Sequence, residues 1–423
     1  MPHTLIFLEP GHFHAALLLR ERHPDVRDEI FVYAPEGPEL ADFLALVESF
    51  NRRPDRPTSW RPAVHASSDP LDRLLAERPG DAVVLAGRND RKISVMRRLH
   101  DAGLPVLADK PWLAGPDGLD DVRHVLSGPP LAMEIMTGRH EITATLLERL
   151  VRETDVFGRF RDGEQGEAAI SLASVHHLAK VVNGAPLRRP PWYFDVRVQG
   201  DGLADIPTHL VDRAQRLVAA AGAGDPAAIE LVSARRWPTQ VPRELFGRIT
   251  GASEFPPELG KVVDGDSLAY LANGELRARI GGVAVELTTH WDLVEPSGGG
   301  DAHAIVLRGT RAHVRIEQSA ATGFQRRLVV EPKADPPAVA AALDRAVASW
   351  QPDLPGLAVA PAAGGLELRI PETVRAGHES HFALVLREFL AHVKRGHWPA
   401  ELTRHTLAKY TLLTQAGARA RAA

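Results

Sequence analysis

The stretch from Asp81 to Pro116 places a lysine at the carboxyl end of an apolar strand. An apolar strand over Ala82–Ala86 precedes a helix with its apolar residues on one face, and a second strand over Val106–Ala108 leads to Lys110. Ligands of open α/β sheets bind beyond the carboxyl ends of parallel strands. The Lys110 ammonium is therefore a candidate site residue, although a lone lysine at a strand end can equally be a surface residue.

Strands alternate with helices throughout the first 136 residues. We expect further strands over residues 4–8, 30–34 and 130–136, helices over 14–22 and 71–77, and a loop over 51–62. This alternation is typical of a doubly wound parallel sheet. The sequence therefore predicts an α/β protein whose residues 1–136 form a domain with a doubly wound parallel sheet.

Beyond residue 137 the pattern changes to helices and then to strands without helices between them. We expect strands over 233–236, 267–273, 275–280, 283–291, 303–308 and 312–318, and helices within 331–366 and over 381–394 and 402–416. The pairs Asn273-Gly274 and Gly281-Gly282 predict hairpin turns. We therefore expect residues 137–423 to form an α+β domain for substrate binding and oligomerisation, with a largely antiparallel, open-faced sheet.

Composition excludes several classes of protein and of site. A chain of 423 residues exceeds the size at which one hydrophobic core keeps growing, which supports two domains. The net charge of −4 gives no overall attraction for nucleic acid or an anionic membrane, and the lack of cysteine excludes disulfides and thiolate chemistry. The first apolar run is short and no long uncharged apolar stretch follows, so we expect no membrane span and a cytoplasmic protein.

The turn after the first strand is an incomplete phosphate-binding loop. Dinucleotide folds usually carry Gly-x-Gly-x-x-Gly here, because glycines permit a tight turn and let backbone amides approach the pyrophosphate. In this chain Gly11 matches the middle glycine, whereas Glu9 and His14 stand at the flanking positions. Gly11, His12 and Phe13 are the candidate cofactor contacts, and an ordinary strand-to-helix turn is the alternative.

The end of the second strand bears on the choice of cofactor. Glu36 follows this strand and is the candidate acid for the ribose hydroxyls. No Arg or Lys lies just past the strand to meet a second phosphate. We therefore expect NAD rather than NADP.

Two motifs carry a resemblance to a known family. Asp109-Lys110-Pro111 follows an aliphatic strand, with Asn89 at the end of the strand before it, and resembles the Glu-Lys-Pro motif of the Gfo/Idh/MocA family of nicotinamide-dependent oxidoreductases. The resemblance implies that residues 1–136 form an NAD(P)-binding Rossmann domain. It also implies that Asn89, Asp109 and Lys110 lie at the cofactor, with Asn89 near the nicotinamide ribose. It also implies that Lys110 lies beside the substrate.

The second motif is GDGLADIPTHLVD, residues 200–212. It resembles the family pattern Asp-x-Gly-x-His-x-x-Asp, in which the first Asp and the His line the substrate site. This chain has Asp205, His209 and Asp212, with Pro207 in place of the glycine. The alternative is structural: Asp205 caps a helix, His209 is buried and Asp212 is ion-paired.

The residue types of these motifs suit hydride transfer. Oxidising a carbinol requires a base for the hydroxyl proton, and an imidazole that titrates near neutrality suits this task. His209 is the candidate base, Lys110 is placed to stabilise a developing alkoxide, and Asp205 is placed to orient His209 or a neighbouring hydroxyl.

A third segment, residues 174–196, is rich in polar and aromatic side chains. It resembles a branch of the family that has its own oxidoreductase carboxyl-terminal domain. By that resemblance His176, His177, Lys180 and Trp192 are candidate substrate residues, since aromatic faces stack on sugar rings while His and Lys bond hydroxyls. A surface helix followed by a proline-rich loop is the alternative.

Three further expectations concern the site. Arg139, just after the sixth strand, is another substrate candidate. Residues 298–303 form either a turn that brings His303 towards the cleft or an ordinary glycine hairpin. Adjacent histidines such as His176 and His177 point apart, so we expect no metal.

These features together predict an NAD-dependent oxidoreductase that acts on a secondary hydroxyl of a sugar, cyclitol or glycoside, assembled as a homodimer or homotetramer. In a variant of this hypothesis, NAD stays bound and transient oxidation drives elimination or hydrolysis of a glycoside. The competing hypothesis is a non-redox binding or regulatory protein on the same fold, because two of three loop glycines are missing.

Overall fold

A computed structural model describes residues 2–182, 185–296, 300–396 and 398–422. The chain divides into two compact units. Unit 1 comprises residues 1–113, 117–141 and 376–407, and unit 2 comprises 114–116, 142–375 and 408–423. Unit 1 thus takes in a carboxyl-terminal segment that a single division after residue 136 assigns to the second domain.

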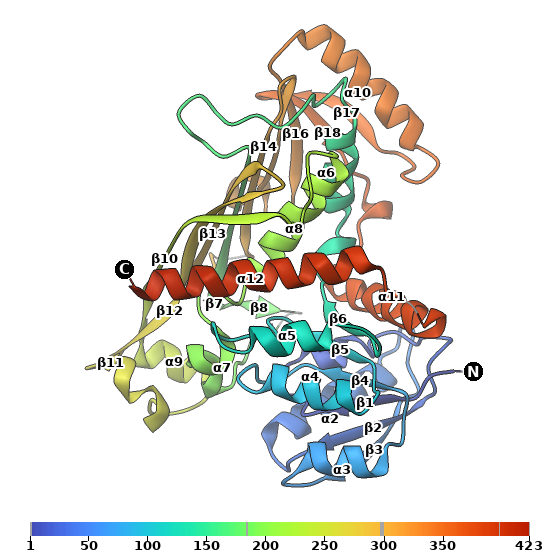
Figure 1. Cartoon of the computed structure of the whole chain (residues 1–423), viewed down its shortest axis with the longest axis vertical. Coiled ribbons are helices and arrows are strands. Elements are labelled where there is room, and N and C mark those ends of the chain that lie inside the picture. Colours follow the sequence, from blue (N-terminus) through green and yellow to red (C-terminus); the bar gives the residue numbers. More distant parts are fainter. Residues whose placement is uncertain (1, 183–184, 297–299, 397, 423) are drawn as a thin grey trace. The chain divides into compact units, whose positions relative to one another are not determined.

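Unit 1 is built on a six-stranded parallel sheet with the strand order β3-β2-β1-β4-β5-β6 (Figure 1). The strands are β1 (Leu5–Leu8), β2 (Glu29–Ala34), β3 (Arg61–Ala66), β4 (Ala82–Leu85), β5 (Val106–Asp109) and β6 (Ala132–Ile135). The helices are α1 (His14–Leu17), α2 (Pro38–Arg52), α3 (Pro70–Glu77), α4 (Lys92–Asp101), α5 (Leu119–Val125), η1 (Thr137–His140), η6 (His378–Ser380), α11 (His381–Arg395) and the start of α12 (Ala400–Ala422). The expected Rossmann sheet is confirmed.

The strand order creates a switch point between β1 and β4. Leu8 at the end of β1 lies beside Tyr33 of β2 on one side and Leu85 of β4 on the other. The chain winds outward in opposite directions from this point, and such sheets bind ligands in the crevice beyond the strand ends there. Strands β1, β4, β5 and β6 are fully buried, as expected of a parallel sheet with both faces covered.

Two local expectations for unit 1 are wrong. The loop expected over 51–62 includes the end of α2 and the start of β3, and the helix expected over 14–22 ends at Leu17. β3 is an edge strand with Pro62 near its start and mostly half-exposed side chains, so it shows no continuous apolar run.

Unit 2 is built on a larger mixed sheet with the path β10-β12-β13-β7-β14-β15-β16-β18-β17. Among the described residues of this sheet, only β7 and β13 pair in parallel. The strands are β7 (Ile170–Ala179), β10 (Ile229–Pro242), β11 (Val263–Asp264), β12 (Ser267–Ile280), β13 (Val283–Val294), β14 (Ala302–Arg308), β15 (Ala312–Gln318), β16 (Arg327–Pro332), β17 (Ala358–Ala362), β18 (Gly365–Arg369), and the separate pair β8 (Val181–Val182) and β9 (Ala185–Pro186). The helices are α6 (Ile142–Arg152), η2 (Pro191–Phe194), α7 (Val196–Gln199), α8 (Pro207–Ala220), α9 (Arg243–Thr250), η3 (Pro257–Val262), η4 (Ala320–Thr322), α10 (Pro336–Trp350), η5 (Glu372–Val374) and the end of α12. The expected, largely antiparallel α+β architecture is confirmed.

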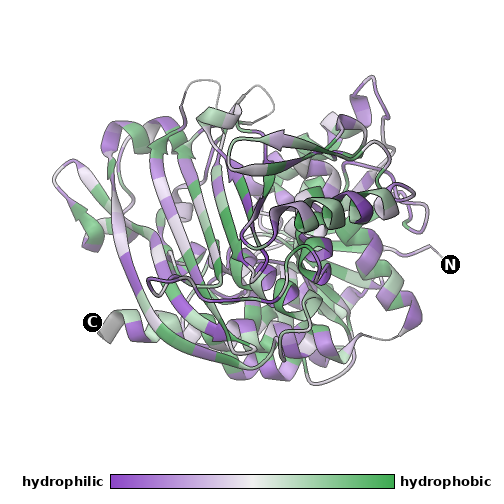
Figure 2. Cartoon of the chain, turned by 90° about the horizontal axis from the view of Figure 1, so that it is seen from above, coloured by the Kyte–Doolittle hydropathy of each residue, from purple (hydrophilic) through white to green (hydrophobic). Residues whose placement is uncertain are grey.

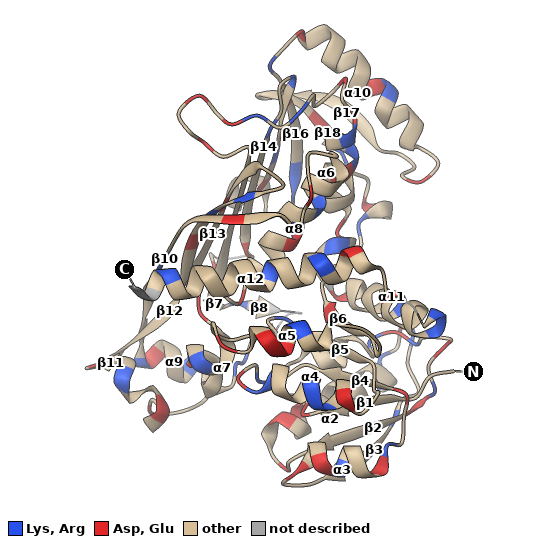
Figure 3. Ribbon diagram, viewed as in Figure 1, with Lys and Arg blue, Asp and Glu red and all other residues tan. Residues whose placement is uncertain are grey.

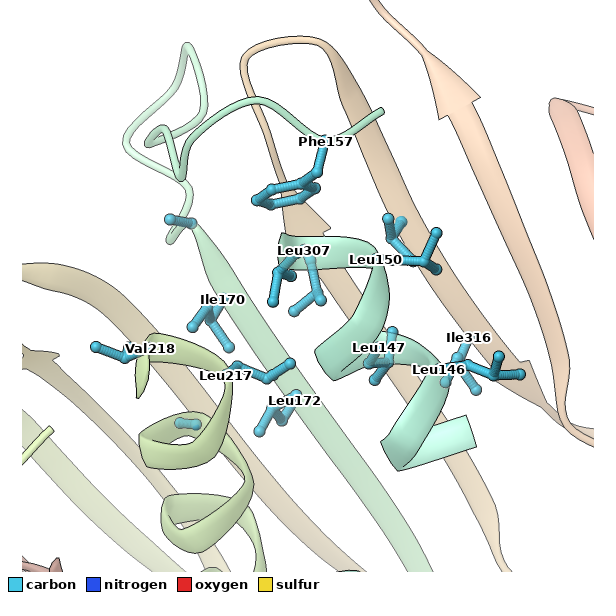
Figure 4. Packing of buried hydrophobic residues seen from close by; sticks show 14 of the residues in the cluster. Leu146, Leu147, Leu150, Phe157, Ile170, Leu172, Leu217, Val218, Leu307 and Ile316 are labelled. Atoms are coloured by element: carbon cyan, nitrogen blue, oxygen red, sulfur yellow. The ribbon is translucent and has the colours of Figure 1, made fainter. Parts of the chain in front are cut away.

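The core of unit 2 lies between one face of this sheet and helices α6 and α8. Leu146, Leu147 and Leu150 of α6 belong to one buried cluster with Ile170 and Leu172 of β7 (Figure 4). Hydrophobic and hydrophilic residues alternate along the strands (Figure 2), as in a sheet with one buried face. This packing holds β7 and α8, which carry the candidate site residues of unit 2.

The hairpin expected at Asn273-Gly274 is wrong, because both residues lie inside the continuous strand β12. A Cβ at Gly274 would overlap the Gly202 carbonyl, and Gly202 bonds the Leu271 carbonyl at 3.0 Å. Gly274 therefore permits a close crossing of two backbones rather than a turn. The hairpin at Gly281-Gly282 is confirmed, since it joins β12 to β13.

Surface charge is mixed along the ribbon (Figure 3), in keeping with the small net charge. Among the described residues, no helix combines the length and the apolar character needed to cross a bilayer.

Candidate functional site

A small cavity of about 30 Å³ lies at the switch point of unit 1. It is lined by Leu8 at the end of β1 and Glu9 after it, by Gly87 and Arg88 after β4, and by the start of α4. Its position matches the place where open parallel sheets bind ligands. It is therefore the candidate cofactor site of this unit.

The first turn is tight although it lacks two glycines. Glu9 adopts φ 46°, a left-handed conformation that glycine takes at little cost, and its carbonyl accepts the Gly11 amide at 2.8 Å. A Cβ at Gly87 would overlap the Glu9 carbonyl. The close approach therefore requires Gly87, which follows a different strand, and the loop motif alone does not point to this residue.

Charge at this turn is partly neutralised. Burial raises the pKa of the Glu9 carboxyl, against the opposing effect of Arg91, whose guanidinium lies 4.0 Å away. Arg88 and Arg91 both line the cavity. A carboxyl that protonates more readily, beside two guanidinium groups, repels an anion less than the sequence suggests.

Asp109 brings the first turn and β5 together. Its buried Oδ2 lies 2.9 Å from His14 Nδ1 and 3.2 Å from His12 Nδ1. Burial opposes ionisation of Asp109, but the two imidazoles outweigh this effect and hold its pKa well below the ordinary value. Of the predicted cofactor residues, His12 and Asp109 are thus in contact, and His14 joins them.

The turn that carries Lys110 is held by a buried lysine that sequence reasoning missed. Lys92 Nζ donates to the Asp109 carbonyl at 2.8 Å, to the Pro111 carbonyl at 3.2 Å and to the Asn89 side chain. Lys92 falls on the buried face of α4 with Met96 and Leu99. Its spacing of four and seven residues from Met96 and Leu99 places it on their face of the helix, and this spacing predicts its burial.

The other predicted residues of unit 1 lie at the sheet's carboxyl edge or beside it. Lys110 follows β5, is half-buried and precedes a cis peptide bond to Pro111. Glu36 is exposed two residues after β2, and the Phe13 ring is tilted against that of His12 with ring centroids 4.6 Å apart. Arg139 lies in η1, where it acts with His140 to hold the pKa of Glu388 low against the effect of burial.

In unit 2, the predicted pair Asp205 and His209 lies at the start of α8. Asp205 is buried and its carboxylate accepts a hydrogen bond from Gln199 Nε2 at 3.2 Å, whereas His209 is half-buried in the first turn. Ile206 holds the N-cap position, so the capping role considered for Asp205 is wrong. Asp212 lies 3.8 Å from the buried Lys409 Nζ, as the ion-pair alternative for Asp212 expects.

The segment with two histidines is the strand β7, so the alternative of a surface helix is wrong. Its polar side chains gather around Asp301, which precedes β14. Asp301 Oδ2 accepts from Lys180 Nζ at 2.6 Å and from His176 Nδ1 at 2.9 Å, and its Oδ1 lies 3.6 Å from His177 Nδ1. Burial opposes ionisation, but these neighbours hold the pKa of Asp301 well below its usual range.

The hydrogen-bond chain continues through Ser174 to a third histidine. Ser174 Oγ lies 2.7 Å from His176 Nε2 and 3.0 Å from His303 Nδ1. Burial, with nearby Arg326 and His176, holds the pKa of His303 well below its ordinary value, so this ring is neutral near pH 7. His303 thus joins the predicted His176, His177 and Lys180, although residues 297–299 of the adjoining turn lie outside the described residues.

Aromatic side chains border this group. The His176 ring lies 5.0 Å from that of Trp291, and the Arg189 guanidinium covers Trp291 and Tyr193 at 5.3 and 4.3 Å. Trp192 is buried and belongs to the same apolar cluster as Trp291, Tyr193 and Phe246. Stacking of Trp192 on a substrate ring stays a prediction.

The comparisons with known proteins agree with this architecture. A family model described as "Putative oxidoreductase C terminal domain" matches residues 146–421. A crystal structure of a "putative oxidoreductase" from Parabacteroides merdae ATCC 43184 is 35% identical, with a TM-score of 0.95, and the match covers 99% of this chain and 98% of that one. No curated protein matches.

More distant structures share the fold. A 3-ketoreductase from Actinomadura kijaniata, in complex with NADP and TDP-benzene, is 16% identical with a TM-score of 0.59, and levoglucosan dehydrogenase in its apo form is 14% identical with a TM-score of 0.61. Each match covers 99% of this chain and 98% of the other. The chain belongs to the Gfo/Idh/MocA family of oxidoreductases, in the branch that carries this carboxyl-terminal domain.

Proposed function

We propose that the protein is a nicotinamide-dependent oxidoreductase that oxidises or reduces a secondary hydroxyl of a sugar, cyclitol or glycoside. The observation that carries this proposal is the position of Lys110 at the carboxyl edge of a parallel sheet, two strands from the switch point. Family membership supports redox chemistry.

The residues at the switch point fit a dinucleotide in most respects. Gly87 lets the backbone after β4 pack closely against the first turn, and Arg88 and Arg91 supply positive charge for a pyrophosphate. Glu36 is exposed beyond β2, where an acid would bind ribose hydroxyls, so we propose NAD ahead of NADP. Bound there, the nicotinamide would accept or give up a hydride.

The chain's own residues then handle the proton and the charge. In this proposal His209 takes the hydroxyl proton as the carbinol is oxidised, and Lys110 stabilises the developing alkoxide. Asp205, fixed by Gln199, orients His209 or a neighbouring hydroxyl of the substrate. Lys92 keeps the Lys110 turn rigid by binding two of its carbonyl groups.

The choice of a carbohydrate-like substrate rests on side-chain chemistry. The group around Asp301 offers imidazole and ammonium donors beside Trp291, a combination suited to hydroxyl-rich rings. One protein of this fold is levoglucosan dehydrogenase, and another is a 3-ketoreductase in complex with NADP and TDP-benzene. We further propose a cytoplasmic homodimer or homotetramer that uses the open face of the large sheet.

The test is a panel of sugars, cyclitols and glycosides, followed through formation of reduced nicotinamide with NAD or NADP as the oxidant. With a substrate in hand, Lys110→Ala and His209→Ala should each lower turnover by about two orders of magnitude or more. The exposed side chains of Lys333 and His290 provide matched controls, and Lys333→Ala and His290→Ala should retain full rates. Near-normal rates in both site variants would refute the assignment.

A further inference from the structure

The first turn of unit 1 brings two histidines close to a buried aspartate. His12 and His14 are separated by one residue after β1, and Asp109 ends β5. One ring nitrogen from each histidine and one carboxylate oxygen lie within 4.8 Å of one another. These groups come from distant parts of the sequence, and the strands β1 and β5 bring them to the same edge of one sheet.

The contacts within the cluster leave His12 poorly satisfied. His14 Nδ1 lies 2.9 Å from Asp109 Oδ2 in hydrogen-bonding geometry. His12 Nδ1 is buried and lies 3.2 Å from the same oxygen, yet it makes no hydrogen bond within the described part of the chain. Close approach of this nitrogen to a carboxylate oxygen is favourable when a proton or a metal cation lies between the two atoms.

Two imidazoles and one carboxylate are a donor set typical of zinc and related divalent transition metals. Bond lengths of about 2.0–2.2 Å place the ligand atoms of a tetrahedral centre roughly 3.3 Å apart. The distances of 2.9 and 3.2 Å to Asp109 Oδ2 need to lengthen by only a few tenths of an ångström. Asp109 Oδ1 is already fixed by the Lys110 amide at 3.0 Å, which orients Oδ2 towards the histidines.

We propose that His12, His14 and Asp109 bind one divalent transition-metal ion of the zinc class, with a fourth position open to water or a ligand. Both histidines coordinate through Nδ1, so in the metal-bound form each neutral ring carries its proton on Nε2. The inference goes beyond the proposed oxidoreductase function, because coordination by these three side chains requires no nicotinamide. It also departs from the expectation that the protein holds no metal.

The structure offers a matched control for this site. His100, Asp101 and His124 form a second cluster of the same composition, on α4 and α5, with an exposed Asp101. Each cluster can be disabled without touching the other. Binding at the exposed cluster is the main competing explanation for any metal uptake.

The experiment is a titration of EDTA-treated, full-length protein with Co²⁺, followed by visible absorption, and with Zn²⁺ by calorimetry. In the His124→Gln background we expect one ion per chain, and adding His12→Gln or His14→Gln should weaken binding at least ~100-fold, more than the usual effect of losing a second-shell partner. His12 is partly exposed, so His12→Gln should fold normally, which circular dichroism checks.

Two results would overturn the inference: no binding by the His124→Gln protein, or unchanged affinity after either loop substitution. A parallel titration with NADH separates this question from the proposed function. Metal uptake without NADH binding would support the metal site and contradict the oxidoreductase proposal. NADH binding without metal uptake would support the oxidoreductase proposal and contradict the metal site.

Discussion

Replacing Asp301 by asparagine removes the negative charge to which His176 and Lys180 of unit 2 are hydrogen-bonded. The amide keeps the shape of the side chain but loses charge-assisted hydrogen bonds from His176 at 2.9 Å and Lys180 at 2.6 Å. Hydrogen bonds to charged groups contribute about 1.5–3 kcal/mol each. Because Lys180 is partly exposed and keeps some hydration, we expect a total loss of about 3 kcal/mol in local stability.

The pH dependence of this loss follows from the direction of the pKa shift. Burial opposes ionisation of Asp301, but His176, His177 and Lys180 outweigh it and hold the pKa well below that of an unfolded chain. A depressed carboxyl pKa stabilises the fold above the unfolded value and loses this effect as pH falls towards the folded one. The difference in stability between wild type and variant should therefore be largest at neutral pH and decrease below about pH 4.

Hydrogen exchange followed by mass spectrometry measures this local effect directly. A loss of about 3 kcal/mol corresponds to exchange roughly 100-fold faster in peptides from β7 and β14. Asp353→Asn is the control, because that carboxylate is 71% exposed and pairs with Arg149 at 2.8 Å on the surface of the same unit. Unchanged exchange in Asp301→Asn, or equal acceleration in the control, would refute the reasoning.

Two further substitutions test the backbone geometry. Gly274→Ala should destabilise unit 2 by about 2 kcal/mol in chemical denaturation, because its Cβ meets the Gly202 carbonyl. Gly260→Ala is the control and should be neutral, because a Cβ there has open space around it. Equal effects of the two substitutions would contradict the close crossing. Glu9→Gly relieves a left-handed backbone conformation, so a thermal melt should show a gain of about 1 kcal/mol in stability. The substitution also removes a carboxyl group from the cavity, so NADH should bind more tightly. Weaker NADH binding would count against the cofactor site.

The sequence predicted those parts of the fold whose residues alone reveal their burial. Strands β1, β4, β5 and β6 are continuous apolar runs because both faces of the sheet are covered. The edge strand β3 lacks this apolar run. The pair Asn273-Gly274 has a sequence typical of a turn, but glycine is required at position 274 because the backbone of Gly202 passes close to it. Tertiary contacts, which the local sequence does not reveal, decided both positions.

The candidate site was predictable to a similar extent. Lys110 and His209 lie in local motifs, and His176, His177 and Lys180 were found together in one segment. Their common partner Asp301 is more than a hundred residues away, and it reaches them because β14 pairs with β7. Only the pairing of these strands reveals that partnership.

The central claim is that unit 1 binds a nicotinamide cofactor at its switch point. The most direct measurement is a fluorescence titration of purified protein with NADH and NADPH, comparing wild type with Gly11→Leu, whose added side chain meets Glu39 beside the first turn. We predict micromolar NADH affinity in the wild type and loss of binding in the variant. A wild-type protein that binds neither nucleotide would contradict the account and favour a non-redox binding protein on the same fold.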